Sequence, residues 1–196
     1  IYLKGENIYF KDKEIYNINT PRNLLGEYNL NNIMFVLAVS EILKLDISKT
    51  IKSISDFKTL EHRLEFVGEY NGILYYDNSI ATIPKATIEA IKALKNVDTL
   101  IIGGMDRGLD YTDFVKFLNE SDISNIICMP KTGHDIAKNL KDGRAYVVNT
   151  LDEAVEIAKK HTTKGRVCLL SPAAASYGFF KNFEEKGNIY KELVKK

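Results

Sequence analysis

The chain has 196 residues, of which 45% are hydrophobic and 27% charged, and its formal net charge at pH 7 is +1. This length and composition suit one sizeable globular core, or one domain with part of another. The basic residues are dispersed among acidic ones, and no run is long or apolar enough for a membrane span or a signal peptide. We therefore expect neither nucleic acid nor a membrane as a partner.

Both cysteines lie in apolar runs, Cys128 in "IICM" and Cys168 in "VCLL". Such runs are typical of buried strands, so the pattern predicts reduced core thiols in a cytoplasmic protein rather than metal ligands or nucleophiles. The chain opens with Ile1 rather than Met, directly in a strand-like pattern. We expect it to be a fragment of a longer protein.

The organisation of the sequence changes near residue 57. Before it, short β segments and a loop through Pro21 and Gly26 lead into two expected helices, Leu30–Leu45 and Ser48–Ser55. These 56 residues look too small and uneven for a complete enzyme domain. The first helix carries apolar residues that we expect to fall largely on one face: Ile33, Val36, Leu37, Ile42 and Leu43.

After residue 57, strand and helix patterns alternate. Asn71-Gly72 predicts a β-hairpin, Pro84 suits the first turn of a helix, and Thr150 with Glu153 forms a capping box. The alternation predicts an α/β fold with a mainly parallel sheet and helices on both faces. The expected helices and strands are Pro84–Leu94, Thr99–Ile102, Thr112–Leu118, Asn125–Met129, Asp135–Leu140, Ala145–Val148, Leu151–His161, Val167–Leu170 and Tyr177–Val194.

Three loops that follow strands are rich in chemical groups. They are "DNSIAT" from Asp77, "GGMDRGLDY" with Arg107, and "SPAAASYGFFKNFEEKG", in which Ser176 is placed to cap a helix. Ligands of such sheets bind beyond the carboxyl ends of the strands, where glycines admit a ligand and a helix N-terminus favours an anion. Each loop also has an ordinary structural explanation. The polar residues from Asp77 could simply form a turn, Asp106 and Arg107 a solvated ion pair, and the loop with Ser176 an ordinary transition from strand to helix.

A fourth element, "LEHRLEF", precedes the hairpin and contains His62 and Arg63. A single histidine in this context is more often structural than catalytic. Arg63 is the stronger candidate, because an arginine between two modules suits contact with phosphate.

Five segments together resemble the Mur ligases: "LLGEYNLNNIMFVLAVSEIL", "LEHRLEFV", "YYDNSIATIPKATIEAIKAL", "LIIGGMDRGLDY" and "CLLSPAAASYGFFKNFEEKGNIYKELV". The resemblance implies that residues 1–56 are the tail of a central ATPase domain. It implies that residues 57–196 are a Rossmann-like, three-layer C-terminal domain that binds the incoming amino acid. The sequence contains no G-x-x-x-x-G-K-[ST] motif, so we expect the P-loop and the Mg²⁺ ligands upstream of Ile1 and no metal site within the fragment.

Within the family, the match is greatest to the members that add D-glutamate to UDP-N-acetylmuramoyl-L-alanine in peptidoglycan synthesis. The resemblance then implies an ATP-dependent amide-forming ligase of small-molecule substrates, working as a monomer in the cytoplasm. ATP would convert the substrate carboxylate into an acyl phosphate, which the amine of D-glutamate would attack. The fragment alone would be inactive.

The family motifs imply roles for individual residues. For ATP these are Asn29, Arg63, Asp77 and Asn78; Asn32 would only hold its helix. For D-glutamate they are Thr82, Arg107, Ser176, Tyr177 and Phe183, and Arg63 and Arg107 would be catalytic.

The chain departs from the family pattern at several of these motifs. Tyr28 replaces a usual His, Asp77-Asn78 a usual Asn-Asp, and Ile80 and Arg107 each a frequent Lys. The alternatives are a sister ligase for a diamino acid, a folylpolyglutamate synthase, or a non-catalytic Rossmann-like nucleotide-binding module. "SPAAAS" followed by "FKNFEEKG" favours the D-glutamate enzyme.

Overall fold

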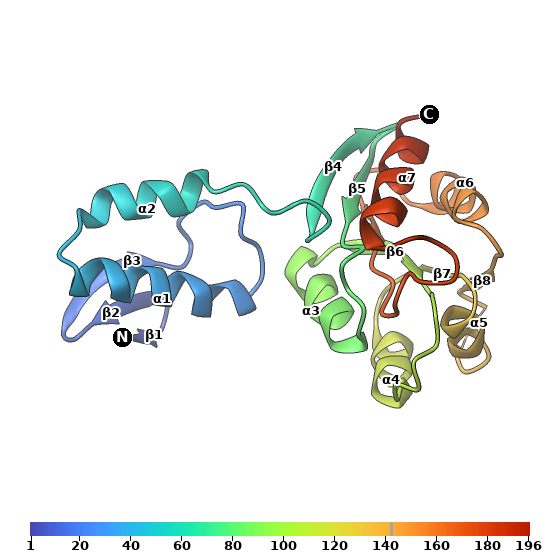
Figure 1. Cartoon of the computed structure of the whole chain (residues 1–196), viewed down its shortest axis with the longest axis horizontal. Coiled ribbons are helices and arrows are strands. Elements are labelled where there is room, and N and C mark those ends of the chain that lie inside the picture. Colours follow the sequence, from blue (N-terminus) through green and yellow to red (C-terminus); the bar gives the residue numbers. More distant parts are fainter. Residues whose placement is uncertain (142) are drawn as a thin grey trace. The chain divides into compact units, whose positions relative to one another are not determined.

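The computed structural model describes residues 1–141 and 143–196, which form two compact units, Ile1–Thr59 and Leu60–Lys196 (Figure 1). Each unit has an apolar core made of its own residues. No helix among the described residues combines the length and the apolar character that a membrane crossing requires.

The first unit contains a small antiparallel sheet and two helices. The sheet runs in the order β1 (Tyr2–Lys4), β2 (Asn7–Phe10), β3 (Lys13–Asn17), and the helices are α1 (Tyr28–Ile42) and α2 (Ile47–Asp56). Asp46 caps α2, because its carboxylate accepts hydrogen bonds from the backbone N–H groups of Ser48 and Lys49. The expected short β segments and two helices are confirmed.

Helix α1 has apolar residues on two faces, and this corrects the single face expected from the sequence. Ile33 and Leu37 are buried in the core of the unit, whereas Val36, Ile42 and Leu43 are exposed. Phe35 and Val39 join the exposed set. The spacing of these residues places them along one side of the helix, which forms an exposed apolar stripe.

The second unit is built on one six-stranded sheet in the order β4-β5-β9-β6-β7-β8. Strand β4 pairs with β5 in antiparallel fashion, and all other pairs are parallel. The mainly parallel α/β fold expected from the alternation is confirmed. The elements are β4 (Glu65–Tyr70), β5 (Ile73–Asp77), α3 (Pro84–Leu94), β6 (Val97–Ile102), α4 (Thr112–Glu120), β7 (Asn125–Cys128), α5 (Thr132–Ala137), β8 (Ala145–Val147), α6 (Leu151–His161), β9 (Val167–Leu170) and α7 (Phe183–Lys195).

Helices cover both faces of this sheet (Figure 1). The crossover through α3 runs across the sheet in the opposite direction to the crossover through α6, so right-handed connections place these helices on opposite faces. Helices α6 and α7 pack together over a core that includes Tyr75, Ile101, Ile127 and Tyr190. Helix α3 packs beside α4.

Several local predictions are confirmed by the backbone. Asn71 and Gly72 have φ angles of 54° and 80°, which suit a tight turn between β4 and β5. Pro84 opens α3, and the Thr150 hydroxyl accepts a hydrogen bond from the Glu153 N–H at the start of α6. Turn and cap residues thus determine where these elements begin.

Two helices begin elsewhere than expected. Helix α5 starts at Thr132 rather than Asp135, because Gly133 lets the chain turn tightly against the ends of β6 and β7. Helix α7 starts at Phe183 rather than Tyr177, and its N-cap is Asn182, whose side chain accepts a hydrogen bond from the Glu185 N–H. Ser176 therefore caps no helix.

Candidate functional site

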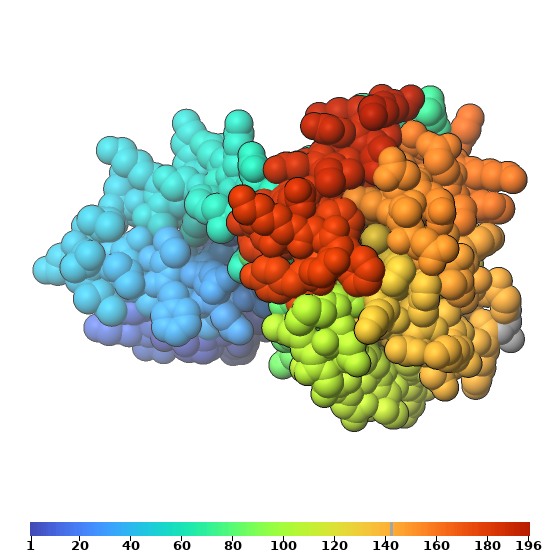
Figure 2. Space-filling view, turned by 45° about the vertical axis from the view of Figure 1, so that its right-hand side comes forward, coloured from blue at the N-terminus to red at the C-terminus, as the bar shows by residue number. Residues whose placement is uncertain are grey.

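The loops after β6 and β9 are joined to each other at the carboxyl edge of the sheet. The Gly103 N–H donates to the Pro172 carbonyl at 2.9 Å, and the Met105 N–H donates to the Ala175 carbonyl at 2.7 Å. A Cβ atom at Gly104 would lie 2.2 Å from the Ala175 oxygen, so this contact requires glycine. The glycines thus admit the backbone of a neighbouring loop. Figure 2 shows the orange-red segment after β9 at the surface beside the yellow-green region that follows β6.

The loop after β5 is fixed by buried side chains. Asp77 is fully buried; its Oδ2 lies 2.7 Å from His62 Nδ1, and its Oδ1 accepts from the Ser79 N–H at 2.8 Å. Asn78 accepts from the Leu64 N–H and donates to the Ser171 hydroxyl at 3.0 Å. These bonds tie the loop to the segment around residue 63 and to the end of β9.

Arg63 is exposed between two residues in the left-handed region, His62 with φ 63° and Leu64 with φ 49°. The His62–Asp77 and Leu64–Asn78 contacts hold both neighbours. Among the residues that the structure describes, the Arg63 guanidinium has no ion-pair or hydrogen-bond partner. A supported loop with an unpaired guanidinium suits recognition of an anion.

Arg107 and Thr82 are in direct contact. The Arg107 Nη2 donates to the Thr82 carbonyl at 3.1 Å, which joins the loop after β6 to the loop after β5. The Arg107 side chain is otherwise exposed. Its remaining N–H groups therefore stay available for a carboxylate.

The segment that follows β9 carries the other residues expected to bind D-glutamate. The Ser176 hydroxyl is buried, and no partner for it occurs among the described residues. Its carbonyl accepts from the Phe180 N–H at 3.1 Å, so the chain makes a turn where a helix was expected. Tyr177 is exposed, and the Phe183 ring meets His62 edge-on with centroids 5.9 Å apart.

Two residues of helix α7, Lys186 and Gly187, pack against the loops at this edge of the sheet, and they were not predicted from the sequence. A Cβ atom at Gly187 would lie 2.3 Å from His62 Nδ1 and 2.5 Å from Asp77 Oδ2. Lys186 is buried, and its Nζ donates to the Gly103 carbonyl at 3.1 Å. The spacing of Lys186 with Tyr190 and Val194 was the available signal, since it places the lysine on the apolar face of the helix.

His62, Glu65 and Asp77 lie close enough together to raise the question of a metal ion. Their ligand atoms are already engaged: His62 with Asp77, and Glu65 with the His62 N–H at 2.8 Å and the Lys191 ammonium at 3.1 Å. Gly187 also closes the space beside them. Mg²⁺ prefers an octahedral set of oxygens with several waters, so this trio does not fit it.

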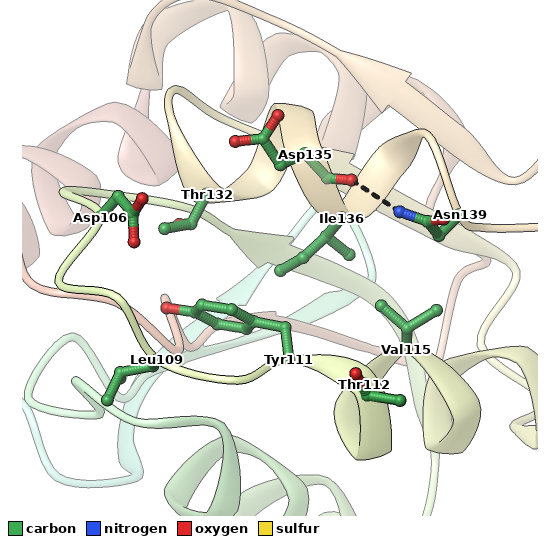
Figure 3. A pocket seen from close by; sticks show the side chains of 9 residues that line it. All are labelled: Asp106, Leu109, Tyr111, Thr112, Val115, Thr132, Asp135, Ile136 and Asn139. Atoms are coloured by element: carbon green, nitrogen blue, oxygen red, sulfur yellow. Dashed lines mark hydrogen bonds between the residues drawn. The ribbon is translucent and has the colours of Figure 1, made fainter.

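A separate pocket of about 400 Å³ lies between α4, α5 and the loop after β6 (Figure 3). It is lined by Asp106, Leu109, Tyr111, Thr112, Val115, Thr132, Asp135, Ile136 and Asn139. The Lys138 ammonium hydrogen-bonds to the Asp135 carboxyl and lowers its pKa, which keeps that group ionised. Two carboxylates at this pocket would repel a carboxylate ligand, so we do not place the amino acid here.

Asn29 belongs to the first unit. Its side chain donates to the Leu25 carbonyl at 2.7 Å and accepts from the Asn32 side chain at 3.2 Å. Both asparagines thus support the start of α1.

The two thiols are core groups, as predicted. Cys128 and Cys168 are both fully buried, and burial raises the pKa of each to about 12. Neither is ionised near neutral pH, so neither is suited to be a nucleophile or a metal ligand.

Residues 62–174 match the family described as "Mur ligase, glutamate ligase domain". A UDP-N-acetylmuramoylalanine–D-glutamate ligase of Desulfitobacterium hafniense is 38% identical over 200 residues, covering 99% of this chain and 44% of that protein. The chain thus spans less than half the length of this relative.

Solved structures of similar fold include a MurF from Acinetobacter baumannii, with a TM-score of 0.69 and 16% identity over 87% of this chain and 38% of that one. A bifunctional folylpolyglutamate synthase/dihydrofolate synthase from Yersinia pestis has a TM-score of 0.61 and 19% identity over 84% of this chain and 39% of that one. At such identities the likeness concerns the fold alone. The match to the family model, however, covers more than half of the chain, which therefore belongs to the Mur ligase family through its glutamate ligase domain.

Proposed function

We propose that this chain is the C-terminal part of an ATP-dependent ligase that adds D-glutamate to UDP-N-acetylmuramoyl-L-alanine. The observation that carries the proposal is the junction of the loops after β6 and β9. It brings together the segment with the exposed Arg107 and the segment with the Ser176 hydroxyl, which has no hydrogen-bond partner among the described residues. The relative from Desulfitobacterium hafniense, which bears the name of a D-glutamate ligase, supports the choice of amino acid.

The amino-acid pocket would use the chemistry of this junction. Arg107 would pair with one carboxylate of D-glutamate, and the Thr82 carbonyl already orients its guanidinium. The Ser176 hydroxyl would donate to a carboxylate, which would satisfy its buried oxygen. Tyr177 and Phe183 would line the same pocket from the segment that leads into α7.

ATP contacts are assigned separately to Arg63 in the second unit and to Asn29 in the first. The Arg63 guanidinium suits the phosphates, and the amide of Asn29 would turn to adenine. Asp77 and Asn78 bond within the chain, so they support the Arg63 loop here, and a ribose contact would require them to exchange those partners. We place the Mg²⁺ ligands in the part of the longer protein that this chain does not include.

When bound, ATP supplies the phosphoryl group that activates the substrate carboxylate. The residues of this chain would hold the amine of D-glutamate close to the activated carbonyl and neutralise the charges around it, with Arg63 and Arg107 as the catalytic cations. Catalysis of this kind is mostly positioning and electrostatic stabilisation. We propose a monomeric cytoplasmic enzyme in which this fragment alone is inactive.

The first unit fits the tail of a central ATPase domain. Its α1 stripe exposes Phe35, Val36, Val39, Ile42 and Leu43, and Phe35 is 74% exposed. A contiguous apolar surface of this kind is normally covered. We propose that further residues of the same domain cover it.

A phosphate-release assay on the full-length protein tests the function. With ATP and UDP-N-acetylmuramoyl-L-alanine present, D-glutamate should drive phosphate release, whereas lysine and diaminopimelate should not. Turnover with a diamino acid instead would identify a sister ligase and overturn the proposal. Turnover with a folate substrate and glutamate would favour a folylpolyglutamate synthase.

A further inference from the structure

Lys186 is the most deeply buried cation among the described residues, at 1% exposure. No carboxylate pairs with it within that part of the chain, and burial lowers its pKa to about 8. A position that served packing alone would favour a methionine or leucine, because burying an unpaired ammonium is unfavourable. A lysine at this position is therefore best explained by the contacts that its ammonium makes.

The Lys186 ammonium touches two segments that meet at the carboxyl edge. Its Nζ donates to the Gly103 carbonyl at 3.1 Å and lies 5.2 Å from the centroid of the Phe180 ring. Gly103 is the first residue after β6, and Phe180 lies between Ser176 and α7. One charged group thus bridges the start of one loop and the turn of the other.

The backbone at Gly103 cannot easily yield. Its φ is +120°, and a Cβ atom there would lie 2.3 Å from the Met129 carbonyl oxygen. Its N–H is bonded to the Pro172 carbonyl, so both of its polar backbone groups are engaged, the carbonyl by Lys186. From Gly103 the loop continues to Arg107. Between them, the Met105 N–H donates a hydrogen bond to the Ala175 carbonyl.

We infer that Lys186 is a positioning residue for the amino-acid pocket, which holds the loop of Gly103–Arg107 against the segment of Ser176–Phe183. A charge-assisted hydrogen bond is about twice as strong as a neutral one, which suits the root of a loop that must present an arginine accurately. The inference rests on the proposed function for the identity of the ligand. The position of the loop itself does not depend on it.

The first test compares kinetics in the full-length ligase. Lys186→Met keeps the length and apolar stem of the side chain, so folding should persist. We expect KM for D-glutamate to rise by about 10-fold or more, with KM for ATP nearly unchanged, because a displaced Arg107 weakens only the amino-acid contact. Lys186→Arg should recover most of the affinity, and Lys195→Met, at an exposed position of the same helix, should change nothing.

The second test needs no turnover. Hydrogen exchange of the Met105 amide in this chain should be about 10-fold faster in Lys186→Met than in the wild type, with the Ile101 amide within β6 unchanged. Unchanged Met105 exchange would overturn the inference, as would faster exchange with an unaltered KM for D-glutamate. If the wild-type enzyme does not use D-glutamate, the proposed function fails, and the exchange measurement alone decides whether Lys186 holds the loop.

Discussion

Arg107 is an exposed side chain that one hydrogen bond to Thr82 orients. Among the described residues this is the hydrogen bond that orients the guanidinium, and most of its five donors have no other partner there. In the proposed pocket for D-glutamate, such a residue would determine ligand affinity more than fold stability. Its substitution is therefore the most direct probe of the site.

From the proposed function we predict that Arg107→Ala in the full-length protein raises KM for D-glutamate by at least about 10-fold, since a charged hydrogen-bonding partner would be lost. KM for ATP should change far less. Steady-state kinetics with each substrate varied in turn would measure both. The matched control is Lys164→Ala, which also removes an exposed cation. Lys164 lies beside the hairpin turn at Gly72, at the end of the sheet where the parallel strands begin. An unchanged KM for D-glutamate would remove Arg107 from the pocket.

Lys186 also makes a prediction about stability and pH. Burial lowers its pKa from 10.5 to about 8, so between these values the unfolded chain binds more protons than the folded one. The titration of Lys186 therefore increases the free energy of unfolding by up to about 3 kcal/mol as the pH rises from about 8 to about 10.5. Below pH 8 the lysine is charged in both states, and its contribution no longer varies.

Urea unfolding of the wild type and of Lys186→Met across this range would isolate the effect, since other titrating groups cancel in the difference. The wild type should gain stability relative to the variant with rising pH. A flat difference between pH 8 and pH 10.5 would show that the folded lysine titrates normally.

At the scale of elements, α7 lies against the polar cluster at the edge of the sheet because Gly187 has no side chain. A Cβ atom there would meet His62, Asp77 and Ser79, all at 2.6 Å or less. The neighbouring Lys191–Glu65 ion pair joins the same helix to β4. The glycine thus serves packing, even though it lies inside a helix, where glycine is normally unfavourable.

We predict that Gly187→Ala lowers the free energy of unfolding by about 1–3 kcal/mol through overpacking, despite the better helix propensity of alanine. Asn188→Ala, at the next, exposed position, should stay within about 0.5 kcal/mol of the wild type. Denaturant titration of the two variants would compare them. Equal stability of both would mean that α7 can shift away from His62 without cost.

Local signals predicted most elements well because their causes are local. The Asn71-Gly72 turn, Pro84 and the Thr150 cap act within a few residues. The predicted start of α7 at Tyr177 was wrong, because Ser176 is a residue type that often caps helices. In the structure Gly178, with φ 87°, interrupts the helical backbone, and Asn182 provides the cap instead. Two plausible caps in one segment cannot be ranked from propensity alone.

For the candidate site too, the sequence indicated the features with local causes and not those that depend on tertiary contacts. The sequence indicated the post-strand loops, since a parallel sheet brings them to one edge. It could not indicate the His62–Asp77 pair, the contact of Lys186 with Gly103 or the Thr82 carbonyl as a partner of Arg107. These contacts join residues that are distant in sequence, and only tertiary packing determines them.

At the scale of the whole molecule, each unit has a core of its own. Tyr75, Ile101 and Tyr190 belong to the second unit's core, and Ile8 and Leu37 to that of the first. A unit with its own core should fold alone. The two cores give no reason to expect a single unfolding transition for the chain.

We predict that residues 60–196, expressed separately, fold into a stable domain with a well-dispersed amide spectrum. Their thermal unfolding should be cooperative. NMR spectra and calorimetry of the separate unit would test this. Loss of dispersion or of a cooperative transition would show that the first unit is needed for the second to fold.

The order of strands in the second unit has a consequence for its synthesis. Strand β9 lies between β5 and β6, yet it is the last of the six strands along the chain. As the polypeptide leaves the ribosome, β4–β5 and β6–β7–β8 must wait as two separate pieces until residues 167–170 emerge and join them. The nascent domain cannot gain a continuous sheet earlier, so its exposed strand edges are vulnerable to mispairing and to chaperone capture until β9 has emerged.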